Sequence, residues 1–265
     1  LVSLNAAMQG HMDISFGNVI GSNIANIALI LGLTAMVFPM SVSDRTMKFD
    51  WSVMMLITLL LLAFLIDGNL VFWESLVLVI ILVAYNVYQI RSSRRQQREI
   101  ALEDDQNLLK LWQMLGYLVI GIAALKFGSE FLVKGAVNLA TLWGVSERVI
   151  ALSIVSVGTS LSELAASLVA SFKGKQDLSL GNLIGSNIFN ILAVLGFTGL
   201  LVELPLDSAA LLTYDFPWLI FISLILFPFM RYFTRGTITR SQGLIMFSLY
   251  ILYILGVFFL YKWGC

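Results

Sequence analysis

Apolar runs of roughly 20 residues divide this chain, and each run is long enough to cross the hydrocarbon core of a bilayer as a helix. The runs are too continuous for the strands of an outer-membrane barrel, in which apolar and polar residues alternate over about 10 residues. Only 12% of the residues are charged and 59% are hydrophobic, which departs strongly from a soluble domain. The sequence therefore predicts an all-α polytopic membrane protein, embedded in the lipid bilayer. The runs occupy residues 24–38, 53–66, 70–90, 111–125, 149–172, 183–202, 216–230 and 244–261.

A polar cassette occurs twice within this apolar sequence. Residues 17–34 read GNVIGSNIANIALILGLT, and residues 181–198 read GNLIGSNIFNILAVLGFT. The similarity extends further, because the later spans that open FDWSVMML and YDFPWLIF place Asp50 opposite Asp215. The chain therefore predicts two repeats of about five transmembrane helices each, as in many transporters, with the first repeat incomplete at its N-terminus.

Lysine and arginine residues are distributed unevenly between the two predicted faces of the membrane. Short loops rich in these residues stay in the cytoplasm. We therefore expect residues 91–110 to form a cytoplasmic linker between the halves 1–90 and 111–265, and Cys265 to face outward. The residues on the predicted cytoplasmic face are Arg45, Lys48, Arg91, Arg94, Arg95, Arg98, Lys110, Lys173, Lys175, Arg231, Arg235 and Arg240, whereas the opposite loops carry Arg148 and Lys262.

This charge map also sets the direction of each cassette. The turn before the first copy lies on the outer side, and the turn before the second copy lies on the cytoplasmic side. The two copies therefore enter the membrane from opposite faces, which defines an inverted-topology repeat. Such repeats are typical of secondary transporters, whose substrate site lies near the midplane between the halves. We expect the protein in the inner (plasma) membrane.

Each cassette aligns polar side chains along one helical face, because residues four apart in a helix share a face. The aligned residues are Asn18, Ser22 and Asn26 in the first copy and Asn182, Ser186 and Asn190 in the second. Neighbouring glycines allow close helix packing, and serine and asparagine side chains can hydrogen-bond between helices. For Asn23 and Asn187, which lie off this face, such packing explains the sequence at least as well as ion binding does.

Glu163 lies in an apolar span that contains no other charged residue, VIALSIVSVGTSLSELAASLVASF. A carboxylate at the bilayer centre costs about 2.5–3.5 kcal/mol, so such a residue usually faces a cavity and acts on ions or protons. Ser156, Thr159 and Ser160 lie shortly before it on the same side of the helix. Carboxylate, hydroxyl and amide oxygens suit hard cations such as Na⁺, Ca²⁺ or Mg²⁺, whereas zinc or copper would require histidine or cysteine.

Nothing in the sequence indicates an enzyme or a nucleic-acid-binding protein. An intramembrane protease needs a serine dyad, an aspartate pair or a zinc motif, and the predicted spans contain no histidine and no HExxH sequence. The net charge is zero, which gives no reason to expect a nucleic-acid partner. We therefore expect no catalytic activity and no cofactor, and the sequence predicts no particular oligomeric state.

The motifs GTSLSE at 158–163, GNLIGSNIFN at 181–190 and GNVIGSNIAN at 17–26 resemble those of the sodium/calcium exchanger family. The chain is most similar to bacterial members, since it has no large cytoplasmic regulatory insert. The resemblance implies a ten-helix fold in which two inverted halves enclose four cation sites, and exchange of Na⁺ for Ca²⁺ by alternating access. The ligands implied by position are Glu163, Thr159, Ser160, Ser186, Asn190 and the carbonyl of Ser156 from the second repeat, with Ser22 and Asn26 from the first.

Three departures from the family pattern affect this reading. The first-repeat GTSxPE would fall just before Leu1, so we expect an N-terminally truncated chain that does not exchange Ca²⁺ alone. Ser162 replaces a proline that would kink the helix, which leaves Gly158 and the nearby hydroxyls to loosen it. Asn190 is an acid in some members, which leaves the coupling ion open. The alternatives are an antiporter of the same fold coupled to H⁺ or another cation, and a truncated, non-transporting membrane protein.

Overall fold

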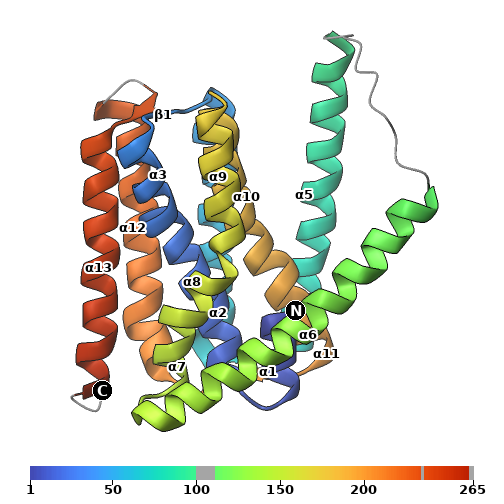
Figure 1. Cartoon of the computed structure of the whole chain (residues 1–265), viewed down its shortest axis with the longest axis vertical. Helices are drawn as coiled ribbons and strands as arrows, with labels where there is room; N and C mark the ends of the chain where they lie inside the picture. The colour runs from blue at the N-terminus through green and yellow to red at the C-terminus, as the bar shows by residue number, and fades with distance from the viewer. Residues whose placement is uncertain (100–110, 234–235, 263–265) are drawn as a thin grey trace.

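The computed structural model describes residues 1–99, 111–233 and 236–262, and these form a bundle of long helices (Figure 1). Within these ranges six helices are long and apolar enough to cross a membrane, and a bent pair makes a seventh span. The six are Met12–Val37, Thr46–Asp67, Phe72–Ser92, Gln176–Leu201, Leu211–Tyr232 and Arg240–Phe259, and the pair is Glu147–Thr159 with Leu161–Phe172. The remaining predicted run, 111–125, lies within α6 (Leu111–Trp143). The prediction of an all-α, multi-pass membrane protein is confirmed.

The two cassette spans are built from the same succession of an α-helix, a π-helical turn and a second α-helix. The first consists of α2 (Met12–Ile24), η1 (Ala25–Ile30) and α3 (Leu31–Val37). The second consists of α10 (Gln176–Phe189), η5 (Asn190–Leu195) and α11 (Gly196–Leu201). The path from α2 to α3 runs opposite to the path from α10 to α11 (Figure 1). The inverted-topology repeat predicted from the sequence is therefore present.

The spans after the cassettes repeat as well. Each begins with a π-helical turn that ends at an aspartate, Asp50 in one half and Asp215 in the other. The elements are η2 (Thr46–Asp50), α4 (Trp51–Phe64), η3 (Leu65–Asp67) and α5 (Phe72–Glu99) in the first half, and η6 (Leu211–Asp215), α12 (Phe216–Pro228), η7 (Phe229–Phe233) and α13 (Arg240–Lys262) in the second. Helix α5 continues to Glu99, past the boundary at residue 90 that the sequence predicted. Residues 100–110 of the expected linker, and Cys265, lie outside the described residues.

The two halves are interlaced rather than placed side by side. At one end β1 (Met40–Ser41) pairs with β4 (Thr237–Ile238), and at the other β2 (Asn69–Leu70) pairs with β3 (Leu204–Pro205). Each ribbon thus takes one strand from each half. In the same way α13 packs along α3, and α5 packs along α11.

Glycine permits the closest of these helix contacts. A Cβ atom on Gly32 of α3 would lie 2.8 Å from the backbone nitrogen of Phe247 in α13. That distance is shorter than van der Waals contact, so the two backbones can meet only where no side chain intervenes. Helix α13 of the second half therefore covers the first cassette span, and helix α5 of the first half covers the second cassette span.

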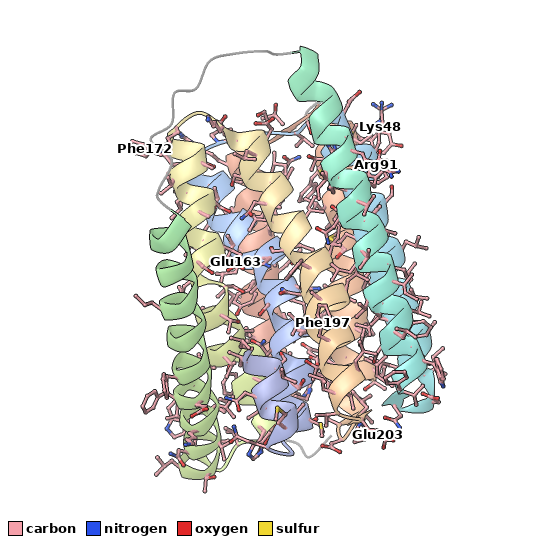
Figure 2. All side chains as sticks on the ribbon, turned by 90° about the vertical axis from the view of Figure 1, so that its right-hand side faces the viewer. Lys48, Arg91, Glu163, Phe172, Phe197 and Glu203 are labelled. Atoms are coloured by element: carbon pink, nitrogen blue, oxygen red, sulfur yellow. The ribbon has the colours of Figure 1, made fainter. Side chains whose placement is uncertain are left out.

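Two residues of the predicted cytoplasmic face, Lys48 and Arg91, lie at the same end of the bundle (Figure 2). Figure 2 shows Lys48 and Arg91 at the same end as Phe172, whereas Glu203 lies at the opposite end.

Arg148 departs from this charge map. We expected it in a loop on the outer face, but it lies in α7 (Glu147–Ile150) and is only 3% exposed. Its Nε and Nη2 atoms donate hydrogen bonds to the two carboxylate oxygens of Asp215, at 2.8 and 3.0 Å, and the Tyr253 hydroxyl donates a third at 2.9 Å. A fully buried carboxylate within a membrane span requires such partners, which explains why the arginine is drawn inward.

Candidate cation-binding site

The bent helix pair carries the charged residue of the candidate site. Helix α8 (Ser156–Thr159) ends at Ser160, and the chain bends by 40° before α9 (Leu161–Phe172) continues with Glu163. This break forms although Ser162 stands in place of the proline of the family pattern. The π-helical turn η4 (Ala151–Val155) precedes it, and such turns mark irregular, functional points in helices.

Hydroxyl groups also loosen the helix at this point. The Thr159 hydroxyl lies 3.0 and 3.1 Å from the backbone carbonyls of Val155 and Ser156, and such back-bonding bends helices. The backbone nitrogen of Ser160 shares its hydrogen bond between the carbonyls of Ser156 and Val157. Ser160 itself is 2% exposed and lies directly at the break.

A first group of oxygens forms where this break meets the first cassette. The carbonyl oxygen of Ser156 lies 3.4 Å from Ser22 Oγ, and Ser22 Oγ lies 3.1 Å from Thr159 Oγ1. Thr159 Oγ1 is also 2.9 Å from Asn18 Oδ1. Three of the predicted ligands, from both halves of the chain, are thus within hydrogen-bond distance of one another. Asn18 belongs to the same group, and its signal in the sequence was its place on the polar face of the cassette.

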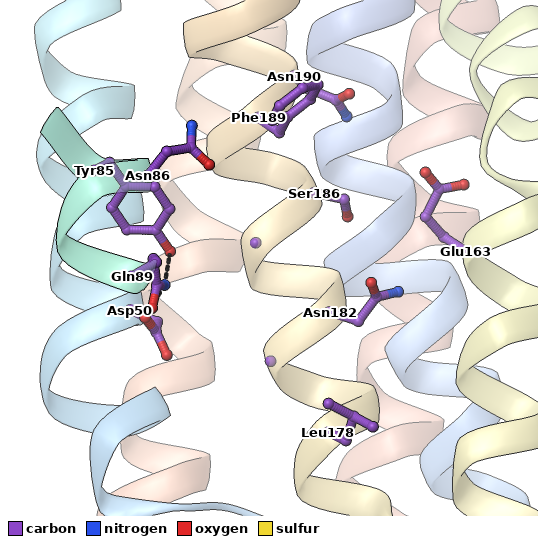
Figure 3. Close-up of a pocket in the computed structure, with 12 residues that line it drawn as sticks. Asp50, Tyr85, Asn86, Gln89, Glu163, Leu178, Asn182, Ser186, Phe189 and Asn190 are labelled. Carbon is purple, nitrogen blue, oxygen red and sulfur yellow. Dashed lines mark hydrogen bonds between the residues drawn. The ribbon is translucent and has the colours of Figure 1, made fainter. Parts of the chain in front are cut away.

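A second group of oxygens surrounds a pocket of ≈ 520 Å³ (Figure 3). Ser186 and Asn190 project into it from α10 and η5, and Glu163 faces them across the pocket (Figure 3). Asn182 lines the same wall. The carboxylate of Glu163 accepts a hydrogen bond from the Ser162 hydroxyl at 2.6 Å. One acidic group therefore shares a pocket with hydroxyl and amide oxygens, which is the donor set that hard cations bind.

Asn26 joins the two groups. Its amide nitrogen donates to Ser186 Oγ at 3.1 Å, so a residue of the first cassette contacts a residue of the second. Asn26 is 1% exposed, and its Oδ1 atom is buried without a hydrogen-bond partner among the described residues. An unpartnered buried oxygen costs about 1–3 kcal/mol, which a bound cation would offset.

The two cassettes differ in what covers their glycine faces. A Cβ atom on Gly21 would lie 2.8 Å from the Cβ atom of Ser156, because α8 packs directly against α2. At the equivalent Gly185, no atom of the described residues lies within 4 Å of that position, apart from its chain neighbours and the adjacent backbone of its own helix. Gly185 lines the pocket.

The pocket has a second acidic residue that the site prediction did not include. Asp50 lines it together with Tyr85 and Gln89, and Gln89 Nε2 lies 3.4 Å from Asp50 Oδ1 and 2.7 Å from the Tyr85 hydroxyl. The sequence signal was the match between Asp50 and Asp215 in the repeat. It identified an equivalent position, but it did not show that Asp50 lines a pocket while Asp215 pairs with Arg148.

Comparison with known proteins gives a consistent assignment over nearly the whole chain. A family model described as sodium/calcium exchanger protein matches residues 1–91 and 114–259. A protein of Alkalimonas amylolytica, named as a candidate antiporter, CaxA, is 38% identical over 263 residues, which cover 96% of this chain and 81% of its own. The sodium/calcium exchanger MaX1 of Methanosarcina acetivorans is 28% identical over 296 residues, with 97% and 84% covered.

A solved structure supports the same conclusion. One of the sodium-calcium exchanger NCX_Mj, soaked with Na⁺ and Sr²⁺, superposes with a TM-score of 0.69 at 32% identity, covering 96% of this chain and 80% of that chain. The superposition therefore takes in both halves of this chain. The resemblance noted from the motifs is thereby confirmed: this chain belongs to the sodium/calcium exchanger family of multi-pass cation/Ca²⁺ antiporters.

Proposed function

We propose that this protein exchanges Ca²⁺ for Na⁺ across the membrane by alternating access to one site between its inverted halves. The observation that carries the proposal is the pocket shared by Glu163, Ser186 and Asn190, to which Asn26 of the other half is hydrogen-bonded through Ser186. A site formed jointly by two inverted halves can open to either side when one half rocks against the other.

The chemistry of the residues fits this role. Glu163 would offset part of the charge of Ca²⁺, and the hydroxyl and amide oxygens would replace its water ligands. The oxygens assigned to this task are those of Ser22, Asn26, Ser156, Thr159, Ser160, Ser186 and Asn190. Replacing Ca²⁺ by Na⁺ needs the same oxygens and less negative charge, so one site serves both ions in turn.

We also propose that the end of the bundle with Lys48 and Arg91 faces the cytoplasm and that the protein lies in the inner membrane. Short loops rich in lysine and arginine remain on that side. A relative in Escherichia coli, which is 30% identical over 85% of this chain, is named as inner membrane protein YrbG, and this supports the location.

Glu163→Gln tests the proposed function. Glutamine keeps the shape of the side chain and one oxygen but removes the charge. In the full-length protein, we expect this variant to lower Na⁺-driven ⁴⁵Ca²⁺ uptake into proteoliposomes at least about 30-fold, which corresponds to about 2 kcal/mol, the lower end of the cost of losing one partner of a buried charge pair. Folding should be preserved, because removing a charge from a membrane span lowers the cost of burying it.

Matched variants separate this role from a general effect on the protein. Glu203→Gln changes an exposed carboxylate outside the pocket and should leave uptake unchanged. Ser22→Ala and Ser186→Ala each remove one neutral oxygen and should reduce uptake less than Glu163→Gln does. Uptake by Glu163→Gln at the parent rate would show that Glu163 is not a ligand. Uptake driven by a proton gradient and not by Na⁺ would favour the H⁺-coupled alternative.

A further inference from the structure

Four asparagine side chains meet where the two cassettes cross. The amide nitrogen of Asn23 donates to the backbone carbonyl of Asn187 at 3.2 Å, and that of Asn187 donates to the backbone carbonyl of Asn23 at 3.1 Å. The amide nitrogen of Asn190 donates to Asn23 Oδ1 at 3.0 Å, and that of Asn26 donates to Asn187 Oδ1 at 2.9 Å. Each bond has a counterpart when the halves are exchanged. We call these four residues the asparagine clasp.

Two backbone carbonyls determine the orientation of every amide in the clasp. A carbonyl only accepts hydrogen bonds, so Asn23 and Asn187 must turn their nitrogen atoms toward these carbonyls. Their side-chain oxygens then point the other way, where they can only accept. The amide nitrogens of Asn190 and Asn26 donate to these side-chain oxygens. The oxygens of Asn190 and Asn26 therefore face away from the clasp.

The outward oxygens lie where the candidate site is. Asn190 lines the pocket opposite Glu163 (Figure 3). The nitrogen of Asn26 contacts both Asn187 Oδ1 and Ser186 Oγ, and its buried oxygen has no hydrogen-bond partner among the described residues. Both outer amides thus direct their nitrogen atoms into the clasp, which leaves their oxygens available to a cation.

We infer that Asn23 and Asn187 are positioning residues, which hold the amides of Asn190 and Asn26 with oxygen toward the transported cation. The inference rests on the proposed function, because it assigns a role within the same site. The two ends of an amide are nearly equal in size, so packing alone does not distinguish them. Without the clasp an amide can flip, and its N–H groups then repel a cation that its oxygen would bind.

The connections in the clasp run crosswise, and this gives a specific test. Asn26 is oriented by Asn187 and Asn190 is oriented by Asn23, so each outer amide depends on the opposite half. Asn187→Ala should raise the apparent KM for Ca²⁺ about 10- to 100-fold, as is typical when a residue that orients a metal ligand is lost. Adding Asn26→Asp should cancel most of this rise, because a carboxylate has two oxygens and no N–H group to orient. Adding Asn190→Asp should not cancel it.

The reciprocal pair serves as the matched control. Asn23→Ala should raise the KM to a similar extent, and Asn190→Asp should rescue it while Asn26→Asp does not. The apparent Tm in detergent, measured for every variant, reports the packing role. If Asn23 and Asn187 serve packing alone, the KM changes will follow the Tm changes and either carboxylate will have the same effect in both backgrounds. That result would overturn the inference.

A second readout keeps this test separate from the proposed function. Binding of Ca²⁺ or Na⁺ raises the apparent Tm of the protein without any transport. If the full-length parent protein shows no Na⁺-driven Ca²⁺ uptake but keeps a cation-dependent Tm shift with crosswise rescue, the proposed coupling fails and the inference stands. If the parent shows neither uptake nor a cation-dependent shift, both are overturned.

Discussion

Replacing Arg148 with methionine should destabilise the protein strongly, because it leaves a buried carboxylate without its charged partner. Arg148 is 3% exposed and Asp215 is fully buried, and the two are joined by hydrogen bonds of 2.8 and 3.0 Å. After the substitution, the Tyr253 hydroxyl is the one side chain among the described residues that still donates to Asp215. Breaking a buried pair in this way costs about 3–5 kcal/mol.

Thermal unfolding in detergent measures this cost. A loss of about 3–5 kcal/mol lowers the Tm by about 6–20 °C at about 2–4 °C per kcal/mol for a chain of this size. Arg148→Met with Asp215→Asn should recover most of the loss, since asparagine is neutral and still accepts from Tyr253. The control is Lys48→Met, which breaks an exposed pair with Asp44 and should change stability by less than about 1 kcal/mol.

The reasoning would be refuted in either of two ways. A Tm for Arg148→Met within about 3 °C of the parent would show that Asp215 finds other partners or takes up a proton at little cost. A double variant as unstable as the sum of both single variants would show that Arg148 and Asp215 contribute independently, through packing and not through their mutual charge.

Two further predictions concern the cassettes and the orientation. Gly21→Ala should lower the free energy of unfolding by about 1–3 kcal/mol, because α8 leaves no room for a methyl group. Gly185→Ala should be neutral or slightly stabilising in this chain, because alanine favours the helix and meets no neighbouring helix there. Equal effects of the two substitutions on unfolding in detergent would contradict this difference. In a Cys265→Ser background, an impermeant thiol reagent should label Asp67→Cys in intact cells and Lys175→Cys only after permeabilisation, and the reverse pattern would invert the proposed topology.

The spans and their inverted arrangement could be predicted because both leave local traces in the sequence. A membrane span is an apolar run, and the distribution of lysine and arginine between the loops predicts the direction in which each run crosses the membrane. The duplicated cassette showed that Ser22 and Ser186, and likewise Asn26 and Asn190, occupy equivalent places. The structure brings the predicted ligand Asn26 within 3.1 Å of Ser186, although 160 residues separate them.

The remaining features depend on contacts that no local pattern records. The partner of Arg148 lies 67 residues away, so an arginine beside a predicted loop was read as a loop charge. The repeat showed that Gly21 and Gly185 are equivalent, but it did not show that α8 packs against Gly21 while Gly185 lines the pocket. The sequence did indicate that hydroxyls near Gly158 would loosen the helix in place of the family's proline, but it did not indicate the π-helical turn η4 that precedes the break at Ser160.

The exchange of outer helices between the halves constrains how this protein is made. Helix α3 is synthesised early, but the backbone that covers its Gly32 face belongs to α13, which leaves the ribosome after every other described helix. The strand pair of β1 and β4 likewise waits for residues made nearly 200 positions later. The Gly32 face of α3 must therefore lie against lipid until α13 has been synthesised. Helix α13 of the second half then covers this face of the first half, so assembly cannot proceed one half at a time.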